Sequence, residues 1–206
     1  MIGYYNYTVI LTYIGALSGL AGIAYIGSGQ LKTALICLML SGFCDMFDGK
    51  IASTMERSRQ EKRFGVQIDS LSDLVCFGVL PALIGLHCSR CGLAAMLICA
   101  SYALCALIRL AWFNVDEEER QDREEGCRSF YLGLPVTCSA LLLPLFIGAA
   151  GLLSLNLERL VPGLLLILAA AFITPMHLKK PGLPGLLAMS LLGIATLVLV
   201  FTEVAV

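Results

Sequence analysis

Charged residues are scarce in this sequence. Asp, Glu, Lys and Arg make up only 14% of its 206 residues, hydrophobic residues make up 58%, and the mean hydropathy is +0.85. A soluble globular domain carries about 25% charged residues, so this composition excludes an ordinary soluble protein. Several stretches of about 18 or more residues hold almost no charge, enough for a helix to cross a bilayer. The sequence therefore predicts an integral membrane protein.

Other features are missing as well. The N-terminus has no basic region followed by a small-residue cleavage site, so we expect the first apolar segment to be retained. We find no low-complexity linker, no second domain and no internal repeat, and we interpret residues 1–206 as one membrane domain. The net charge of −1 indicates no partner of either sign, because the charges are segregated along the chain.

The apolar segments predict an all-α fold, a polytopic membrane helix bundle of about seven spans. The segments are residues 8–26, 31–52, 66–86, 92–113, 132–153, 160–175 and 183–201.

Lysine and arginine are distributed unevenly between the connections. If the N-terminus is cytoplasmic, nine fall in cytoplasmic loops: Arg57, Arg59, Lys62, Arg63, Arg120, Arg123, Arg128, Lys179 and Lys180. Three fall outside: Lys32, Arg90 and Arg159. Because cytoplasmic loops of membrane proteins are enriched in these residues, we expect the connection after residue 52 to face the cytoplasm.

The nine cysteines offer little for a metal. Most lie in or at the ends of apolar segments, where a free thiol behaves as a small hydrophobic group. Only "HCSRC", residues 87–91, has ligand-like spacing, and it provides three ligands at most where structural zinc needs four. We interpret it as a turn on the outer side.

The carboxylates form the most informative pattern, within a hairpin over residues 41–87. Asp45 and Asp48 are three residues apart, and Gly65, Asp69 and Asp73 follow one another at intervals of four. Each set occupies one face of a helix. Both faces come close to the cytoplasmic interface, so we expect them to meet just below the membrane surface.

Two interpretations of this cluster are open. The carboxylates could be solvated charges at helix ends, partnered by the cations at positions 57–63. Alternatively they hold one or two hard divalent cations, Mg²⁺ or Mn²⁺, which prefer oxygen ligands and accompany phosphates. The second interpretation explains the shared faces, the small residues beside them, and a carboxylate as costly as Asp73 inside an apolar helix. Nearby Arg and Lys residues fit a diphosphate substrate.

The same residues carry a resemblance to a known family. The pattern D-x-x-D-G-x-x-A followed by G-x-x-x-D-x-x-x-D is the signature of the CDP-alcohol phosphatidyltransferases. It stands here as Asp45, Asp48, Gly49, Ala52, Gly65, Asp69 and Asp73. The stretches "FGVQIDSLSDLVCFGVLPA", "IRLAWFNV" and "FYLGLP" resemble the phosphatidylserine synthase branch of that family. The likeness covers about residues 5–140.

The resemblance implies a six-helix core, a multi-pass cell-membrane protein and an active site on the cytoplasmic side. It implies that two divalent ions are held by Asp45, Asp48 and Asp69, with Asp73 as bridging ligand or catalytic base. CDP-diacylglycerol and L-serine would be the substrates, and CMP a product. A homodimer embedded in membrane lipid, without nucleic acid, is expected. Room for the CDP group would come from Gly49, Ala52 and Gly65.

Two arginines complete the predicted substrate site. Ser53 stands where the family usually has arginine, and Arg57, one helical turn further on, is expected to replace that guanidinium. Arg109 lies inside an apolar segment, where we expect it to bind a phosphate or carboxylate; an ion pair with a motif aspartate, or extension to the membrane surface, are alternatives.

Beyond these residues, the charged run 116–126 is interpreted as a solvated loop, and Gly133 and Pro135 as the start of a helix. Another acceptor, glycerol phosphate or inositol phosphate, fits the same chemistry. A cation-coupled transporter is a remote alternative, because the carboxylates lie in one hairpin at one membrane face without a second copy.

Overall fold

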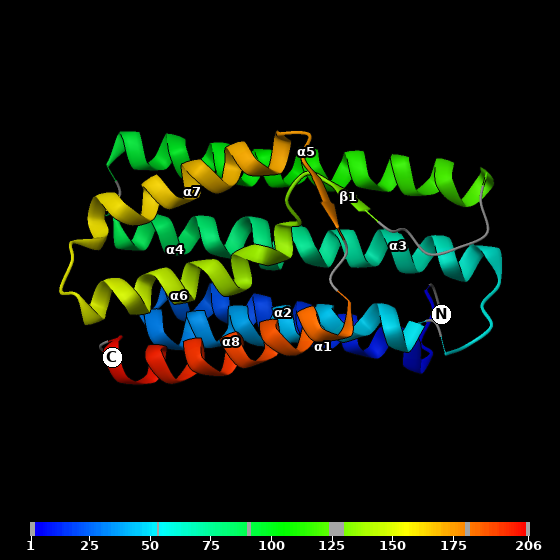
Figure 1. Ribbon diagram of the computed structural model, residues 1–206, viewed down its shortest axis with the longest axis horizontal. Helices are drawn as coiled ribbons and strands as arrows, with labels where there is room; N and C mark the ends of the chain where they lie inside the picture. The colour runs from blue at the N-terminus through cyan, green and yellow to red at the C-terminus, as the bar shows by residue number, and fades with distance from the viewer. Residues whose placement is uncertain (1–2, 53, 90–91, 124–129, 180–181, 205–206) are drawn as a thin grey trace.

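The computed structural model describes residues 3–52, 54–89, 92–123, 130–179 and 182–204, which form helices running side by side along one axis (Figure 1). The helices in the first half are α1 (Tyr7–Gly27), α2 (Leu31–Ala52), α3 (Arg59–Asp73), α4 (Leu80–Cys88) and α5 (Leu93–Arg123). The second half adds α6 (Ser139–Leu152), α7 (Leu157–Ile173) and α8 (Leu183–Glu203). The predicted all-α helix bundle is confirmed.

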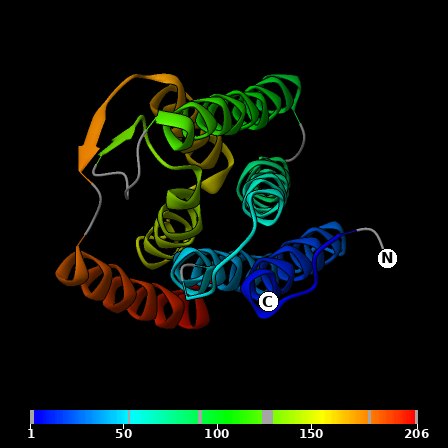
Figure 2. The same cartoon turned by 90° about the vertical axis from the view of Figure 1, so that its right-hand side faces the viewer.

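The middle of the bundle is one long helix. A π-helical segment, η1 (Leu74–Val79), joins α3 to α4, so that helix is continuous from Arg59 to Cys88. It lies between the α1–α2 pair and the α5–α7 pair, as both views show (Figures 1 and 2). Helices α6 and α8 pack against each other and against α2. The helix that carries the second half of the carboxylate motif therefore lies between two helix pairs.

The π-helical segment has a cause in the sequence. Pro81 has no N–H, so the carbonyl of Phe77, four residues earlier, cannot receive its α-helical hydrogen bond. The buried Tyr102 hydroxyl of α5 donates to that carbonyl at 2.7 Å, and the Ser139 hydroxyl lies 3.4 Å from it. Side chains of α5 and α6 thus satisfy the backbone carbonyl that lies one turn after Asp73.

The α3 end of this helix is defined by a capping box. The Ser58 side chain accepts from the backbone N–H of Glu61, and the Glu61 carboxylate accepts from the backbone N–H of Ser58 at 2.9 Å. The helix therefore begins at Arg59, seven residues before the predicted span 66–86. Cations predicted to lie in a connection, among them Lys62 and Arg63, belong to its first turns.

One of the two predictions about connections is wrong. The charged run 116–126 is helical to Arg123, where α5 ends, and its later residues lie outside the described part of the chain. Glu and Arg are strong helix formers, and Arg63 of α3 forms an ion pair with Glu118. The turn predicted for residues 87–91 begins where α4 ends, and positions 90 and 91 lie outside the described residues.

The helix predicted to begin near residue 132 begins later. Phe130–Leu132 forms strand β1, which pairs antiparallel with β2 (His177–Lys179). Gly133 then adopts a φ of +80°, a left-handed conformation that favours glycine, and the 3-10 turn η2 (Val136–Cys138) leads into α6. Sequence alone did not indicate this sheet, because each strand is only three residues long.

Within the described residues, three helical segments are long and apolar enough to cross a membrane: Tyr7–Gly27, Arg59–Cys88 and Leu93–Glu119. Val136–Leu152 and Leu187–Glu203 are shorter apolar helices. Large apolar side chains point outward along several helices, for example Leu17, Leu97, Leu104, Ile167 and Leu191. The chain is a membrane protein. The total of seven crossings remains a prediction, because the other helices fall short of the length or the hydropathy of a span.

Small residues let α1 approach the middle of the bundle. A Cβ on Gly15 would lie 3.2 Å from the Cβ of Cys44 in α2, and one on Gly19 would lie 2.4 Å from the Sγ of Cys76 in η1. The Ser41 hydroxyl of α2 donates to the Gly15 carbonyl at 2.9 Å. These contacts fix α1 closely against both helices that bear the aspartates.

We predict that Gly19→Ala destabilises the protein by about 1–3 kcal/mol, because the new methyl group overpacks the α1–η1 contact. Gly27→Ala in the same helix is the matched control, since a Cβ there meets no atom within 4 Å. Thermal unfolding in detergent compares the two. Equal melting temperatures for both variants would contradict the close packing at Gly19.

Candidate metal centre

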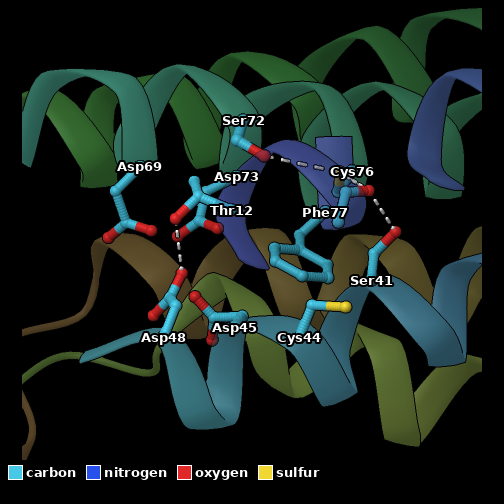
Figure 3. A pocket seen from close by; sticks show the side chains of 11 residues that line it. Thr12, Ser41, Cys44, Asp45, Asp48, Asp69, Ser72, Asp73, Cys76 and Phe77 are labelled. Carbon is cyan, nitrogen blue, oxygen red and sulfur yellow. Dashed lines mark hydrogen bonds between the residues drawn. The ribbon is translucent and has the colours of Figure 1, made fainter. Parts of the chain in front are cut away.

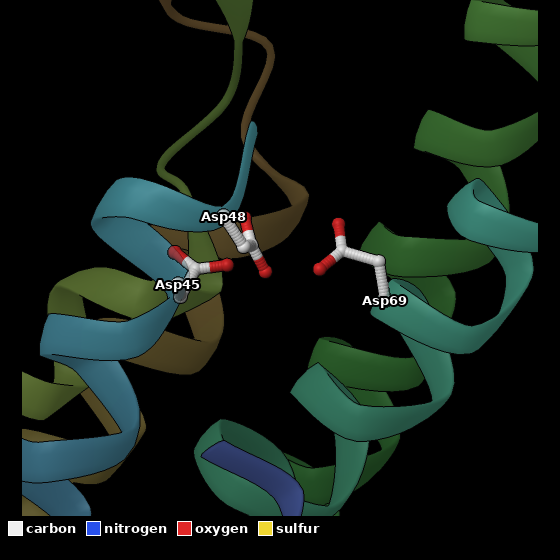
Figure 4. Close-up of side chains that lie close together, drawn as sticks. All are labelled: Asp45, Asp48 and Asp69. Atoms are coloured by element: carbon white, nitrogen blue, oxygen red, sulfur yellow. The ribbon is translucent and has the colours of Figure 1, made fainter. Parts of the chain in front are cut away.

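Three aspartates converge between α2 and α3. Asp45 and Asp48 lie one turn apart near the end of α2, and Asp69 faces them from α3 (Figure 4). One carboxylate oxygen from each lies within 4.8 Å of the other two. The two predicted acidic faces therefore do meet, as the helical spacing of the motif required.

Asp73, the fourth motif aspartate, lies one turn beyond Asp69 at the end of α3. It is outside the group of three and lines the same cavity, where Figure 3 shows all four carboxylates turned toward one another. It adjoins the π-helical segment and is the aspartate furthest along its helix into the bundle. Asp73 thus lies one turn deeper in the bundle than Asp69 and shares the cavity with the other three.

The cavity between the aspartates is small. A water-sized sphere has only about 10 Å³ in which to move, roughly the space for one water molecule or ion. Its walls are Thr12, Gly15, Ser41, Cys44, Asp45, Asp48, Asp69, Ser72, Asp73, Cys76 and Phe77. A nucleotide does not fit there, so any larger ligand has to approach from the open side.

The donor set fits a hard cation. The residues that line the cavity include four carboxylates and no Lys, Arg or His. The cations at positions 57–63, considered as partners for the aspartates, do not belong to its lining. Carboxylates held together in this way repel one another unless a cation lies between them, and oxygen ligands suit Mg²⁺ and Mn²⁺.

The other motif positions lie at the α2–α3 connection. Gly49 is exposed, and a Cβ on it would meet no atom within 4 Å. An open hollow of about 510 Å³ is lined by Ala52, Met55, Glu56, Arg57 and Lys62. Ser53 lies outside the described residues. Open space for a larger ligand is thus found beside Gly49 and Ala52.

Arg57 lies against the second motif glycine. Its Nη1 is 3.0 Å from the position that a Cβ on Gly65 would take, and its Nε is buried without a hydrogen bond to the described residues. Gly65 therefore makes room for this guanidinium, rather than leaving an empty surface as the sequence suggested. The predicted replacement for the motif arginine does lie next to the motif.

Arg109 lies apart from this group. It is 7% exposed and lines neither hollow. Its Nε and the Phe172 and Thr174 carbonyl oxygens lie within 3.3 Å of the Cβ position that Gly133 leaves empty. Its guanidinium is also 5.7 Å from the Phe113 ring centre. The side chain is thus packed at the β1–α6 connection and the end of α7.

Sequence reasoning missed the contribution of α1. The Thr12 hydroxyl donates to Asp48 Oδ2 at 3.1 Å, and both residues are buried. Thr12 lies three residues before Gly15, on the small-residue face of α1, and that position was the available signal.

Comparisons with known proteins agree with the geometry. Residues 5–176 match the family model described as CDP-alcohol phosphatidyltransferase. A protein of Mycobacterium bovis named CDP-diacylglycerol–serine O-phosphatidyltransferase is 28% identical over 150 residues, 72% of this chain and 49% of its own length. Proteins of the same name from Helicobacter pylori strain J99 and Saccharomyces cerevisiae are 27% identical over 178 residues and 38% over 100 residues.

These matches differ in extent. The Helicobacter match covers 82% of this chain and 70% of the relative, and the yeast match 48% and 35%. The chain spans about half the length of the mycobacterial relatives. With a family model matching most of its length and the motif aspartates converging in space, the chain belongs to the CDP-alcohol phosphatidyltransferase family.

Proposed function

We propose that this protein transfers a phosphatidyl group from CDP-diacylglycerol to L-serine, giving phosphatidylserine and CMP. The observation that carries the proposal is the convergence of Asp45, Asp48 and Asp69 at the family motif. The choice of serine is supported by the names of the relatives from three genera. The chain spans only part of those relatives, and therefore its activity as a whole is proposed from this site.

Asp45, Asp48 and Asp69 are the proposed ligands of two divalent ions, Mg²⁺ or Mn²⁺, with Asp73 bridging or accepting a proton. Such ions, when bound, stabilise the charge that develops on a diphosphate as it is cleaved. The small carboxylate-lined cavity supports one of these ions, and the second is proposed from the resemblance.

The acceptor then reacts as follows. Asp73 takes the proton of the serine hydroxyl, and the serine oxygen attacks the lipid-side phosphorus. A new P–O bond to serine forms while the phosphoanhydride bond breaks, and CMP departs with its electron pair. Asp73 suits the base role because it lies one turn deeper in its helix than Asp69, in the cavity that the other three aspartates line.

The open hollow is the proposed place of the CDP group. Ala52 lines the hollow, and a Cβ on Gly49 would meet no atom within 4 Å. Arg57, which packs against Gly65, binds phosphate in place of the guanidinium missing at Ser53. Arg109, which lines neither hollow, is proposed as an anchor for the lipid phosphate or the serine carboxylate.

The proposed setting is the cell membrane with the site on the cytoplasmic side, as the distribution of Lys and Arg favours. Soluble serine and CMP exchange freely there. A homodimer is proposed from the resemblance alone. The transporter alternative is not carried forward, because the chain belongs to a transferase family and the carboxylates form one cluster.

The test is acceptor choice by the purified protein. Given CDP-diacylglycerol and labelled serine, glycerol phosphate or inositol phosphate, it is expected to release CMP and label lipid with serine only. If glycerol phosphate or inositol phosphate labels the lipid instead, the transfer chemistry stands and serine is not the acceptor.

We predict that Asp45→Ala, Asp48→Ala and Asp69→Ala each abolish transfer and Mn²⁺ binding, because each removes a ligand. Electron paramagnetic resonance of free Mn²⁺ measures the binding. Glu158→Gln, in the first turn of α7, is a control expected to keep both properties. Wild-type transfer that continues in excess EDTA would contradict the metal mechanism.

Arg57→Ala is expected to weaken CDP-diacylglycerol binding by about 10- to 100-fold, the weight of a charged hydrogen bond of about 1.5–3 kcal/mol. Adding Ser53→Arg is expected to restore part of that loss. Binding and KM for the lipid are measured on the same preparation. An Arg57→Ala protein with unchanged kinetics for the lipid would show that the Arg57 guanidinium does not bind the lipid substrate.

Asp73→Asn keeps the size of the side chain and cannot accept a proton at neutral pH. We therefore expect metal and CDP-diacylglycerol binding to persist while turnover falls by about 10² or more. If binding and turnover are lost together, Asp73 is chiefly a metal ligand and another group is the base.

A further inference from the structure

We propose that Thr12 of α1 is a positioning residue for the metal centre, acting by orienting the Asp48 carboxylate. The inference rests on the proposed metal-dependent function and adds a third helix to a site so far built from α2 and α3. It starts from one hydrogen bond, Thr12 Oγ1 to Asp48 Oδ2, which Figure 3 shows as a dashed line.

The hydroxyl of Thr12 points away from its own helix. A Thr or Ser within a helix commonly donates to the carbonyl four residues earlier. Among the described residues, five hydroxyl side chains do so: Ser28, Ser41, Thr174, Thr196 and Thr202. Thr12 instead donates across the helix interface to a carboxylate. Its rotamer is thus set by Asp48 rather than by its own backbone.

Burial gives this contact weight. Thr12 and Asp48 are each 8% exposed, so water competes little for the hydrogen bond. A hydroxyl donating to a carboxylate makes a charge-assisted hydrogen bond with a preferred direction. With Oδ2 held from α1, the plane of the carboxylate is fixed and Oδ1, together with the remaining lone pair of Oδ2, is left for a cation.

The packing of α1 makes this reach possible. Gly15, one turn after Thr12, lets the backbone of α1 approach Cys44 of α2, the residue before Asp45. Ser41 and Cys76 then both donate to the Gly15 carbonyl, at 2.9 Å and 3.5 Å. Helix α1 is thereby tied to both aspartate-bearing helices beside the point where Thr12 meets Asp48.

Removal of a group that orients a metal ligand typically weakens metal binding by 10- to 100-fold. Thr12→Val keeps the shape of the side chain and removes the hydroxyl, so Mn²⁺ affinity is expected to fall at least about tenfold. Thr12→Ser keeps the hydroxyl and is expected to stay within about threefold of wild type. Mn²⁺ binding is followed by electron paramagnetic resonance, without lipid substrate.

Thr8→Val is the matched control. Thr8 is also buried on α1, one turn earlier, but its hydroxyl donates to Asn6 Oδ1 instead of an aspartate. Its Mn²⁺ affinity is expected to equal that of the wild type. Melting temperatures in EDTA report folding separately from metal binding, and Thr12→Ala replaces Thr12→Val if the valine protein does not fold.

The outcomes separate the two claims. Weak Mn²⁺ binding by Thr12→Val or Thr12→Ala, restored in Thr12→Ser, supports the positioning role. Wild-type affinity without the hydroxyl, or equally weak binding by the serine protein, overturns that role and leaves the metal centre standing. A wild-type protein that binds no Mn²⁺ contradicts the metal centre itself, and the role of Thr12 with it.

Discussion

Repulsion between carboxylates inside a bundle of apolar helices is the constraint on which the rest of this structure depends. Three carboxylate oxygens lie within 4.8 Å of one another, and among the described residues no positively charged side chain lines the cavity they share. Like charges at such distances in a poorly solvated site are tolerated when a cation lies between them. The helices therefore hold the aspartates in an arrangement that calls for a divalent ion.

Several structural features keep those carboxylates in place. The capping box at Ser58 defines where α3 starts, and the Tyr102 hydroxyl satisfies the carbonyl that Pro81 leaves without a donor. The hydrogen bond from Tyr102 lies one turn after Asp73, where a change in helical register would rotate Asp69 and Asp73 relative to the aspartates of α2. On the other side, Gly15 and Gly19 bring α1 close enough to complete the cavity wall. Each of these features is local. Together they hold α2 and α3 in position against α1.

The site was predictable from the sequence to the extent that it depends on helical periodicity. The spacing of Asp45, Asp48 and Asp69 placed them on facing surfaces, and the structure brings them together. Long-range contacts were not predictable: the hydroxyl of Thr12 meets Asp48 across 36 positions, and Arg109 packs against Gly133. The short strands were missed because they form by pairing with each other across a long stretch of sequence. The helical continuation of α5 was missed because an ion pair with the distant Arg63 stabilises it.

Anomalous scattering from crystals grown with Mn²⁺ tests the central claim most directly, because it locates the ion independently of activity. The account predicts a peak between α2 and α3, about 2.1–2.2 Å from oxygens of Asp45, Asp48 and Asp69, as expected for Mn²⁺ bound by carboxylates. A map without a peak there, in which Arg or Lys side chains neutralise the aspartates, would contradict it.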